Sequence, residues 1–366
     1  MTSVVFLWDN IGPLHADRIE ATRARLQDAA RIVGVSVFAG SNEYDWVPAT
    51  QGSVTLFADR REFGPVRFAG RLLGLVRRHR AGHVFLCNHD RSYVFLAALL
   101  LRATGRRVYL MVDSKFDDRE RFLRRELAKW VFLLPYHGAM VAGPRSHDYM
   151  RFFGFPPERI RLGYDTVDVA RLRGQAGKDP EPPFADRPFI IVARLVEKKN
   201  IALAIRAFAA AFAANRQRRL LICGSGPLLA DLQRLCGQLG VAELVEFKGF
   251  VQTEVVSKLL AGSLALVLPS VEEQYGQVIA EAQALGTPAI VSLPCGARDE
   301  LIRSGVNGFI VEPDNVEGLA YFMTLLGNDE VLWRRMKERT EGFAGLADAD
   351  RFARSVAGFV TGEEAR

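Results

Sequence analysis

The sequence lacks an apolar run of the kind that crosses a membrane or directs secretion. Its uncharged apolar stretches stay below the roughly 18 residues of a membrane span. The apolar run near the N-terminus, within "MTSVVFLWDN", meets Asp9 after about five residues, which is too short for the core of a signal peptide. We therefore expect a cytoplasmic protein.

Cysteine is also scarce, and no two cysteines have the Cys-x-x-Cys spacing that metal and redox sites favour. The four cysteines are Cys87, Cys223, Cys236 and Cys295. We expect buried thiols in a reducing compartment and no metal site. Two acidic motifs leave that expectation unchanged. The motif "DAD" (348–350) precedes a helical segment, where aspartate is a good N-cap, and "DSKFDDR" (113–119) has no further ligands around it.

Positive charge is in modest excess, because 48 Lys and Arg face 42 Asp and Glu in 366 residues, a net charge of +6. Arginines gather at 77–80, 102–107 and 119–127. We interpret these clusters as solvated helix faces, since no apolar face is interleaved with the charges. The alternative is peripheral contact with an anionic surface at the inner face of a membrane, or with a lipid-linked acceptor. No nucleic-acid-binding module is recognisable, so no nucleic acid partner is expected.

Short apolar runs alternate with helix-periodic segments along the chain, and this alternation occurs twice. Such a pattern predicts an α/β protein with two doubly wound parallel sheets. The predicted strands are 3–8, 35–40, 83–88, 107–112 and 138–143, then 188–194, 219–224, 244–249, 264–270, 287–292 and 308–313. Proline, glycine and charge without periodicity mark a linker at 171–187. It divides a domain of residues 1–170 from one of residues 188–343, and a C-terminal helical segment, 344–366, follows.

The clearest candidate site lies where the predicted strand 264–270 leads into a helix that ends at Gly286. The start of that helix, at Tyr275, Gly276 and Gln277, suits an anion, because helix N-termini present backbone N–H groups and a partial positive charge. Glycine there lets a phosphate approach the backbone. The site should lie in a cleft between the domains, at the carboxyl ends of the strands.

Two glutamates flank this helix start. Glu273 precedes it and suits hydrogen bonds from sugar hydroxyls, whereas Glu281, about a turn and a half into the helix, suits the paired hydroxyls of a ribose. Two glutamates at this spacing also arise by chance in a chain of 25% charged residues. The surrounding strand, Pro-Ser, glycine and helix are what favour a site.

A second candidate group follows the predicted strand 188–194. Arg194 ends this strand and Lys199 comes five residues later, so both could bind a diphosphate, or could be surface residues of a turn. The turn "CGSGPLL" places Gly224 after another strand. Leu229 stands where the dinucleotide fingerprint needs a further glycine, which favours a tight turn near a nucleotide over a dinucleotide site.

Five motifs occur in an order that resembles the retaining glycosyltransferases of family 4. They are "ARLVEKKN", "GSGP", "VEFKGFV", "EQYGQVIAEAQALGTPAIV" and "GVNGFIVEP", and the resemblance covers about residues 188–328. It implies a GT-B fold, in which two Rossmann-like domains face a central cleft. Residues 1–170 would bind the acceptor, residues 188–343 would bind the nucleotide-sugar, and the C-terminal helix, 344–366, would cross back to the first domain. It also implies a nucleotide-diphospho-sugar as donor substrate, with no metal or cofactor required.

The resemblance also assigns roles to residues of the second half. The E-x7-E pair falls on Glu273, for the donor sugar, and Glu281, for the ribose. Arg194 and Lys199 match the basic pair that holds the diphosphate. The turn 247–251, with Gly249 and Phe250, matches the segment beside the base. Glu300 matches a glutamate that often follows a Gly-Gly turn, but Ala297 replaces the second glycine here.

The first half resembles the family less. Its N-terminal loop has a single glycine, Gly12, where the family commonly has a pair, and the resemblance makes Gly12 a donor-binding candidate. Asp113 stands where a histidine is usual. Asp113 could replace that histidine in binding a hydroxyl, or His15 or His89 could fill the space. The acceptor-side candidates are His15, Asn88, His89 and Asp113.

We therefore expect a glycosyltransferase of the hexosyltransferase type. It would move a sugar from a nucleotide-diphospho-sugar to an acceptor hydroxyl, with retention of configuration, in glycan, lipopolysaccharide or natural-product biosynthesis. The acceptor would be a saccharide, a lipid-linked molecule or a small molecule. The alternatives are a nucleotide-sugar epimerase or hydrolase of the same fold, and a non-catalytic nucleotide-binding scaffold.

Overall fold

The structure is a computed structural model, and it describes residues 2–40, 53–58, 60–118, 121–177, 181–214 and 216–362. It divides into two compact units. The first unit combines Met1–Asp168 with Ala349–Arg366, and the second is Val169–Asp348. Arg119 of the third arginine cluster and residues 178–180 of the predicted linker lie outside the described residues.

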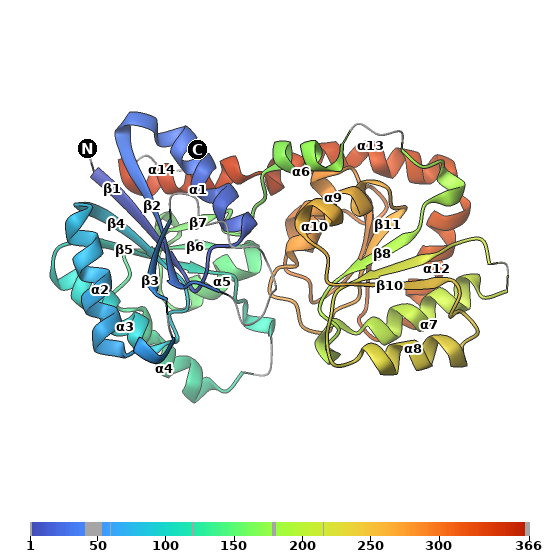
Figure 1. The fold of residues 1–366 in the computed structure, drawn as a ribbon, viewed down its shortest axis with the longest axis horizontal. Helices are drawn as coiled ribbons and strands as arrows, with labels where there is room; N and C mark the ends of the chain where they lie inside the picture. Colours follow the sequence, from blue (N-terminus) through green and yellow to red (C-terminus); the bar gives the residue numbers. More distant parts are fainter. Residues whose placement is uncertain are drawn as a thin grey trace. The chain divides into compact units, whose positions relative to one another are not determined.

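The first unit is built on a parallel sheet (Figure 1). Its strands are β1 (Thr2–Trp8), β2 (Ala30–Phe38), β3 (Ser53–Phe57), β4 (Ala81–Leu86), β5 (Arg107–Val112), β6 (Gly138–Val141) and β7 (Ile160–Leu162). Among the described residues this sheet has seven strands in the order β3-β2-β1-β4-β5-β6-β7. The order reverses direction between β1 and β4, as in a doubly wound fold.

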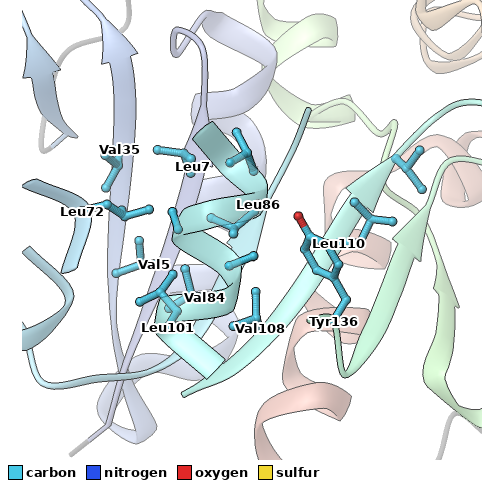
Figure 2. Close-up of a cluster of buried hydrophobic side chains, with 14 of the residues drawn as sticks. Val5, Leu7, Val35, Leu72, Val84, Leu86, Leu101, Val108, Leu110 and Tyr136 are labelled. Carbon is cyan, nitrogen blue, oxygen red and sulfur yellow. The ribbon is translucent and has the colours of Figure 1, made fainter. Parts of the chain in front are cut away.

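Alternation along the central strands sends side chains to both faces of this sheet. Val5 and Leu7 of β1 face one layer, where they join Val84 and Leu86 of β4 in a core that helices α2 (Pro65–Arg78) and α3 (Ser92–Ala103) cover. Figure 2 shows this core, with Leu72 and Leu101 reaching it from the helices. Further along the chain, α4 (Leu123–Leu133) and α5 (Pro144–Phe152) follow β5 and β6.

The opposite face is covered by the first and the last helix of the chain. Phe6 of β1 and Phe85 of β4 belong to a second core, to which α1 (Pro13–Leu26) contributes Ile19. Helix α14 (Ala349–Thr361) contributes Phe352, Val356 and Phe359 to the same core. The C-terminal helix is therefore part of the first unit.

The second unit has its own parallel sheet. Its strands are β8 (Phe189–Val192), β9 (Leu220–Cys223), β10 (Val245–Gly249), β11 (Ala265–Leu268), β12 (Ala289–Ser292) and β13 (Gly308–Val311). Its helices are α6 (Val169–Ala176), α7 (Ile201–Phe212), α8 (Leu229–Gln238), α9 (Thr253–Ala261), α10 (Gln277–Ala284), α11 (Arg298–Leu301), α12 (Val316–Asn328) and α13 (Glu330–Ala347). Within the described part of the chain the sheet has six strands in the order β10-β9-β8-β11-β12-β13.

The predicted α/β class with two doubly wound parallel sheets is confirmed, and the predicted strands are all present. The sequence prediction missed β3 and β7, which are the two edge strands of the first sheet. The segment predicted as a linker, 171–187, contains most of α6. Arg173 of this helix donates a hydrogen bond of 2.9 Å to the carbonyl of Ala284 in α10, so α6 packs as part of the second unit.

Candidate active site

The strand order of the second unit brings two of the predicted loops together. The chain runs outward from β8 to β10 on one side of the sheet and from β11 to β13 on the other, so β8 and β11 are neighbours at the point of reversal. Loops that leave the carboxyl ends of such a strand pair diverge and leave a crevice for a ligand. Arg194 and Lys199 follow β8, and Glu273 follows β11.

Lys199 and Glu273 are in direct contact. The ammonium group of Lys199 donates a hydrogen bond to the Glu273 carboxylate and forms an ion pair with it. The hydroxyl of Ser270 donates to the same carboxylate oxygen at 3.1 Å. The backbone N–H of Val271 donates to the carbonyl of Lys198 at 2.9 Å, which ties the two loops together. The exposed fractions of the Lys199 and Glu273 side chains are only 15% and 12%, so this is a shielded pair.

Helix α10 begins directly after this pair, and glycine is required at its N-cap. Gly276 has φ 93° and ψ 63°, a left-handed conformation that favours glycine. A Cβ there would lie 3.1 Å from Leu268 and Ile279 and 3.3 Å from Glu273. The predicted anion site at Tyr275–Gln277 therefore lies beside Glu273, in the same loop. Glu281 is within α10 and is 8% exposed.

The loops that follow β8, β9 and β10 are joined by backbone contacts. A Cβ on Gly224 would lie 1.9 Å from the carbonyl oxygen of Ala193, so only glycine fits there. The N–H of Gly224 donates to the carbonyl of Gly249 at 2.7 Å, and Leu195 donates to the carbonyl of Ser225 at 2.9 Å. Gly249 has φ 66°, and Phe250 next to it is half-buried. The predicted donor-binding residues of the second unit thus follow neighbouring strands along one edge of the sheet.

Sequence reasoning missed three residues that shape this edge. Ser270 is fully buried and hydrogen-bonds Glu273. A Cβ on Gly226 would lie 2.4 Å from the carbonyl oxygen of Leu195, and one on Gly296 would lie 2.1 Å from that of Gln274. Both glycines stand in turns that follow predicted strands, and this position in the sequence could have pointed to them. Ala297, where the family often has a second glycine, has φ −64° and needs none.

The predicted residues of the first unit also lie at the carboxyl ends of strands. Gly12 follows β1, Asn88 and His89 follow β4, and Asp113 follows β5, and these three strands are neighbours. Asn88 is left-handed, with φ 56°, and the hydroxyl of Ser146 donates to the backbone carbonyl of Asp113 at 2.8 Å. Sheet order thus places these four residues along one edge.

His15 caps the start of α1. Its Nδ1 accepts a hydrogen bond of 3.1 Å from the Gly12 N–H, and its ring lies 4.9 Å from that of Trp8. Burial, with a smaller contribution from the nearby Arg18 guanidinium, lowers the pKa of His15 to about 3. Burial also lowers the pKa of His89 to about 4. Both imidazoles are neutral at pH 7, and His15 acts as a hydrogen-bond acceptor.

The structure gives no support to metal or thiol chemistry in the described part of the chain. No group of three or more His, Cys, Asp and Glu side chains there could hold a metal ion. The four cysteines are buried, and burial raises the pKa of Cys295 to about 12. In the "DAD" motif Asp350 pairs with Arg25 at 2.9 Å, and in "DSKFDDR" Asp118 pairs with Lys115 at 3.3 Å.

No described helix combines the length and the apolar composition that crossing a membrane requires.

Comparison with known proteins shows what the part of the chain that carries this site is similar to. Residues 175–343, less than half of the chain, match the model of the family "Glycosyl transferases group 1". The matched segment spans most of the second unit and includes Arg194, Lys199, Glu273 and Glu281.

Curated proteins that the chain resembles include glycosyltransferases. The chain is 38% identical over 200 residues to an uncharacterized glycosyltransferase, MJ1607, of Methanocaldococcus jannaschii, covering 52% of this chain and 50% of that protein. It is 30% identical over 248 residues to alpha-D-kanosaminyltransferase of Streptomyces kanamyceticus, covering 63% and 61% respectively. The chain thus matches between half and about three fifths of the length of these relatives.

Solved structures extend the likeness to the whole fold. The crystal structure of HepE of Anabaena in complex with UDP and glucose superposes with a TM-score of 0.76, covering 99% of this chain and 100% of that chain at 17% identity. At this identity the likeness concerns the fold. The chain thus has the GT-B fold, as the sequence resemblance implied.

Proposed function

We propose that this protein is a retaining glycosyltransferase of family 4, which transfers a sugar from a nucleotide-diphospho-sugar to an acceptor hydroxyl. The observation that carries the proposal is the shielded Lys199–Glu273 pair at the reversal point of the second sheet, directly before the N-terminus of α10. A cation beside a helix N-terminus suits the diphosphate of such a donor, and the carboxylate between them suits the hydroxyl groups of its sugar.

The proposed roles follow from the chemistry of each group. Arg194 and Lys199 hold the diphosphate and offset the charge that grows on it as the glycosyl bond breaks. Glu273 accepts hydrogen bonds from the sugar, and Glu281 from the ribose. The helix dipole of α10, whose N-cap is Gly276, adds positive potential at the phosphates.

The ion pair gives this scheme a definite sequence of events. Before the donor binds, the charges of Lys199 and Glu273 are paired with each other. A diphosphate would draw Lys199 towards its oxygens, and the sugar hydroxyls would then satisfy the Glu273 carboxylate. A front-face reaction fits retention, with a diphosphate oxygen taking the proton of the acceptor hydroxyl as that hydroxyl attacks the anomeric carbon. No metal ion or cofactor has a role in this scheme.

Relatives support the donor class. HepE of Anabaena was crystallised with UDP and glucose, and the relative from Streptomyces kanamyceticus is an alpha-D-kanosaminyltransferase. We propose a uridine or similar nucleoside diphosphate as the carrier, and a saccharide, lipid-linked or small-molecule acceptor. The acceptor would bind at the edge of the first sheet, near His15, Asn88, His89 and Asp113, and Gly12 would lie on the donor side. The pathway is glycan, lipopolysaccharide or natural-product biosynthesis.

The test is a binding panel followed by turnover. Calorimetry and thermal shift with UDP, GDP, ADP and TDP, each with and without common sugars, should give one preferred nucleotide, because a ligand of the folded state raises the melting temperature. Arg194→Ala should weaken that binding by at least roughly tenfold, as loss of a charged hydrogen bond does. Glu273→Ala should leave nucleotide binding intact and abolish transfer.

Other outcomes separate the alternatives. Release of nucleotide from the preferred donor at full rate without any acceptor indicates a hydrolase or epimerase. Nucleotide binding without turnover in an acceptor screen indicates a scaffold. Unchanged turnover in Glu273→Ala contradicts the assignment of the site.

A further inference from the structure

A cavity opens at the carboxyl edge of the first sheet, between the turn that follows β5 and one face of α5, the helix that follows β6 (Figure 1). Its volume is about 350 Å³, within the range of small-molecule sites. We call it the α5 cavity, and the residues that line it are Phe116, Asp117, Arg145, Asp148, Tyr149 and Phe152. Ser146 of α5 donates to the backbone carbonyl of Asp113, so the cavity adjoins the acceptor-side candidates.

The four lining residues of α5 share one face of that helix, because they stand at positions i, i+3, i+4 and i+7. Arg145 lies in the first turn of α5 and Phe152 is its last residue, so the face extends about 10 Å along the helix. Since α5 starts just after the carboxyl end of β6, the charged end of the cavity lies beside the sheet edge and the aromatic end points away from it.

Three aromatic rings form the apolar walls of the α5 cavity. Phe116 meets Phe152 edge to face, with ring centroids 6.0 Å apart, and meets Tyr149 in the same manner at 6.1 Å. Tyr149 is buried, whereas Phe116 and Phe152 are 52% and 53% exposed. Two half-exposed rings above a buried one therefore offer ring surface that a ligand can cover.

A carboxylate is fixed at the charged end of the α5 cavity. Asp117 pairs through one oxygen with Arg145 at 2.5 Å and through the other with Lys115 at 3.2 Å. Lys115 is fully buried, but the side chain of Asp117 is 48% exposed. Each carboxylate oxygen has more than one lone pair, so Asp117 can accept further hydrogen bonds while two cations hold its orientation. Asp148, with its side chain 81% exposed, supplies a second carboxylate.

This combination of groups suits a neutral sugar. A hexose ring has a face of C–H groups that can pack on an aromatic ring, and a rim of hydroxyl groups that donate to carboxylates. An acyl chain in the cavity would remove water from Asp117 without replacing its hydrogen bonds. An anionic ligand would meet two carboxylates, and the guanidinium of Arg145 is already paired with Asp117.

We propose that the α5 cavity binds a neutral hexose unit of the acceptor. The ring would cover Phe116 and Phe152, and its hydroxyl groups would donate to Asp117 and Asp148. This inference rests on the proposed function, and it narrows the acceptor to a saccharide, free or attached to a carrier.

The first experiment measures binding directly and needs no turnover. Saturation-transfer NMR with the full chain and the methyl glycosides of glucose, galactose and mannose should show transfer to the ring C–H protons of at least one of them. The same glycoside should then give a dissociation constant by titration. Octyl glucoside tests the apolar alternative, because an acyl-type occupant would show transfer confined to the octyl chain.

Variants of exposed residues locate the binding. Phe152→Ala should weaken binding of the glycoside by at least roughly fivefold, since it removes a stacking surface. Asp148→Asn should weaken it by a similar factor without disturbing the buried Lys115, and Asp117→Asn by roughly tenfold, since a fixed charged acceptor is lost. Phe122→Ala removes a ring that is 58% exposed outside the cavity, so it is the matched control and should bind as the parent does.

Turnover gives a second readout, which separates this inference from the proposed function. With a saccharide acceptor, Phe152→Ala should raise the acceptor KM by at least roughly fivefold and leave the affinity for the nucleoside diphosphate unchanged. Failure of the parent to bind any nucleotide would contradict the proposed function. Transfer to a saccharide with an unchanged acceptor KM in Phe152→Ala and Asp148→Asn would contradict the sugar site alone.

The binding experiment can also overturn the inference by itself. Three results would do so: no transfer to any of the methyl glycosides, transfer that stays the same in Phe152→Ala and Asp148→Asn, and transfer to the octyl chain only. Melting temperatures equal to the parent's would exclude misfolding as the cause of any loss of binding.

Discussion

At the scale of single residues, the pairing of Lys199 with Glu273 decides how the candidate site works. The sequence suggested separate tasks for the two side chains, but in the structure each is the other's partner. A shielded carboxylate that loses its cation is destabilised, because burial penalises an unpaired charge. Under the proposed function, the diphosphate and the carboxylate would therefore compete for one ammonium group.

This competition predicts an asymmetric pair of variants. Lys199→Ala should weaken nucleoside diphosphate binding by roughly tenfold or more, since it removes a charged contact. Glu273→Ala frees Lys199 and should bind the nucleotide at least as tightly as the parent. The double variant should resemble Lys199→Ala alone. Calorimetry measures all three, and Lys198→Ala, one residue away, is the control.

The opposite order of affinities would contradict this scheme. If Glu273→Ala weakened nucleotide binding as much as Lys199→Ala, the carboxylate would be a positioning group for the lysine and not its competitor.

A second prediction at the residue scale concerns His15 and the pH dependence of folding stability. Its pKa is about 3 in the folded protein, below the ordinary 6.5, and its Nδ1 must be unprotonated to accept from Gly12. Between these two values the unfolded chain binds a proton that the folded chain does not, so stability is lost as pH falls from about 6.5 towards 3. Glutamine at this helix position keeps an acceptor for Gly12 without titrating.

His15→Gln should therefore lose less unfolding free energy than the parent between pH 7 and pH 5, as measured by urea denaturation. Burial lowers the pKa of His83 and His89 to about 4, so some of the pH dependence should remain. His147→Gln is the control. An identical pH dependence in His15→Gln and the parent would show that His15 does not carry the effect.

At the scale of elements, the start of α10 couples backbone conformation to the site. Gly276→Ala would place a Cβ in a left-handed conformation, against Leu268, Ile279 and Glu273. We expect a loss of about 1–3 kcal/mol in unfolding free energy, together with weaker donor binding, because the helix N-terminus and Glu273 would shift. Urea denaturation and calorimetry check the two effects.

Gly286→Ala separates strain from function. Gly286 also has positive φ, 77°, but it follows the other end of α10, where a Cβ would meet nothing closer than 3.8 Å. This variant should lose stability and keep donor affinity. Equal losses of affinity in both variants would mean that any weakening of α10 impairs the site.

The same elements show what the sequence could predict. Central strands such as β1 and β11 are short runs of buried side chains, and both were found from composition. The edge strands β3 and β7 were missed. Strand β7 has only three residues, and in β3 only the last two of five residues are buried. Periodicity also revealed nothing of the direction in which α4 faces. Its rotation depends on Tyr149 and Arg121, which meet Glu126 only in the folded chain.

For the site, local motifs carried most of the prediction. Arg194, Lys199, Glu273 and Gly276 each follow a recognisable strand or begin a helix. Their mutual contacts could not be derived from these motifs, because they depend on β8 and β11 being neighbours. Gly296 was missed for the same reason, since it is required only where its backbone meets Gln274.

At the scale of the whole molecule, the first unit is discontinuous in sequence. Helix α14 packs on α1, and Arg25 of α1 pairs with Asp350 of α14 at 2.9 Å. The hydroxyl of Tyr109 in β5 donates to the carbonyl of Phe359 at 3.2 Å. One face of the first sheet is therefore covered only after α14, the last helix, has packed on it. The second unit, by contrast, is built from one continuous stretch of sequence.

This arrangement predicts that the two units can be destabilised separately. Phe352 of α14 is fully buried against Phe6, with ring centroids 5.4 Å apart, and Phe352→Ala should remove about 3–5 kcal/mol of stability from the first unit. Phe208→Ala, at an equally buried position in α7, should do the same to the second unit. In scanning calorimetry each variant should lower a different part of the unfolding transition. Nucleotide should still raise the melting temperature of the second unit in Phe352→Ala, because its proposed contacts lie in that unit. A single transition that both variants shift equally would instead mean that the two units unfold as one, and that α14 stabilises the molecule as a whole.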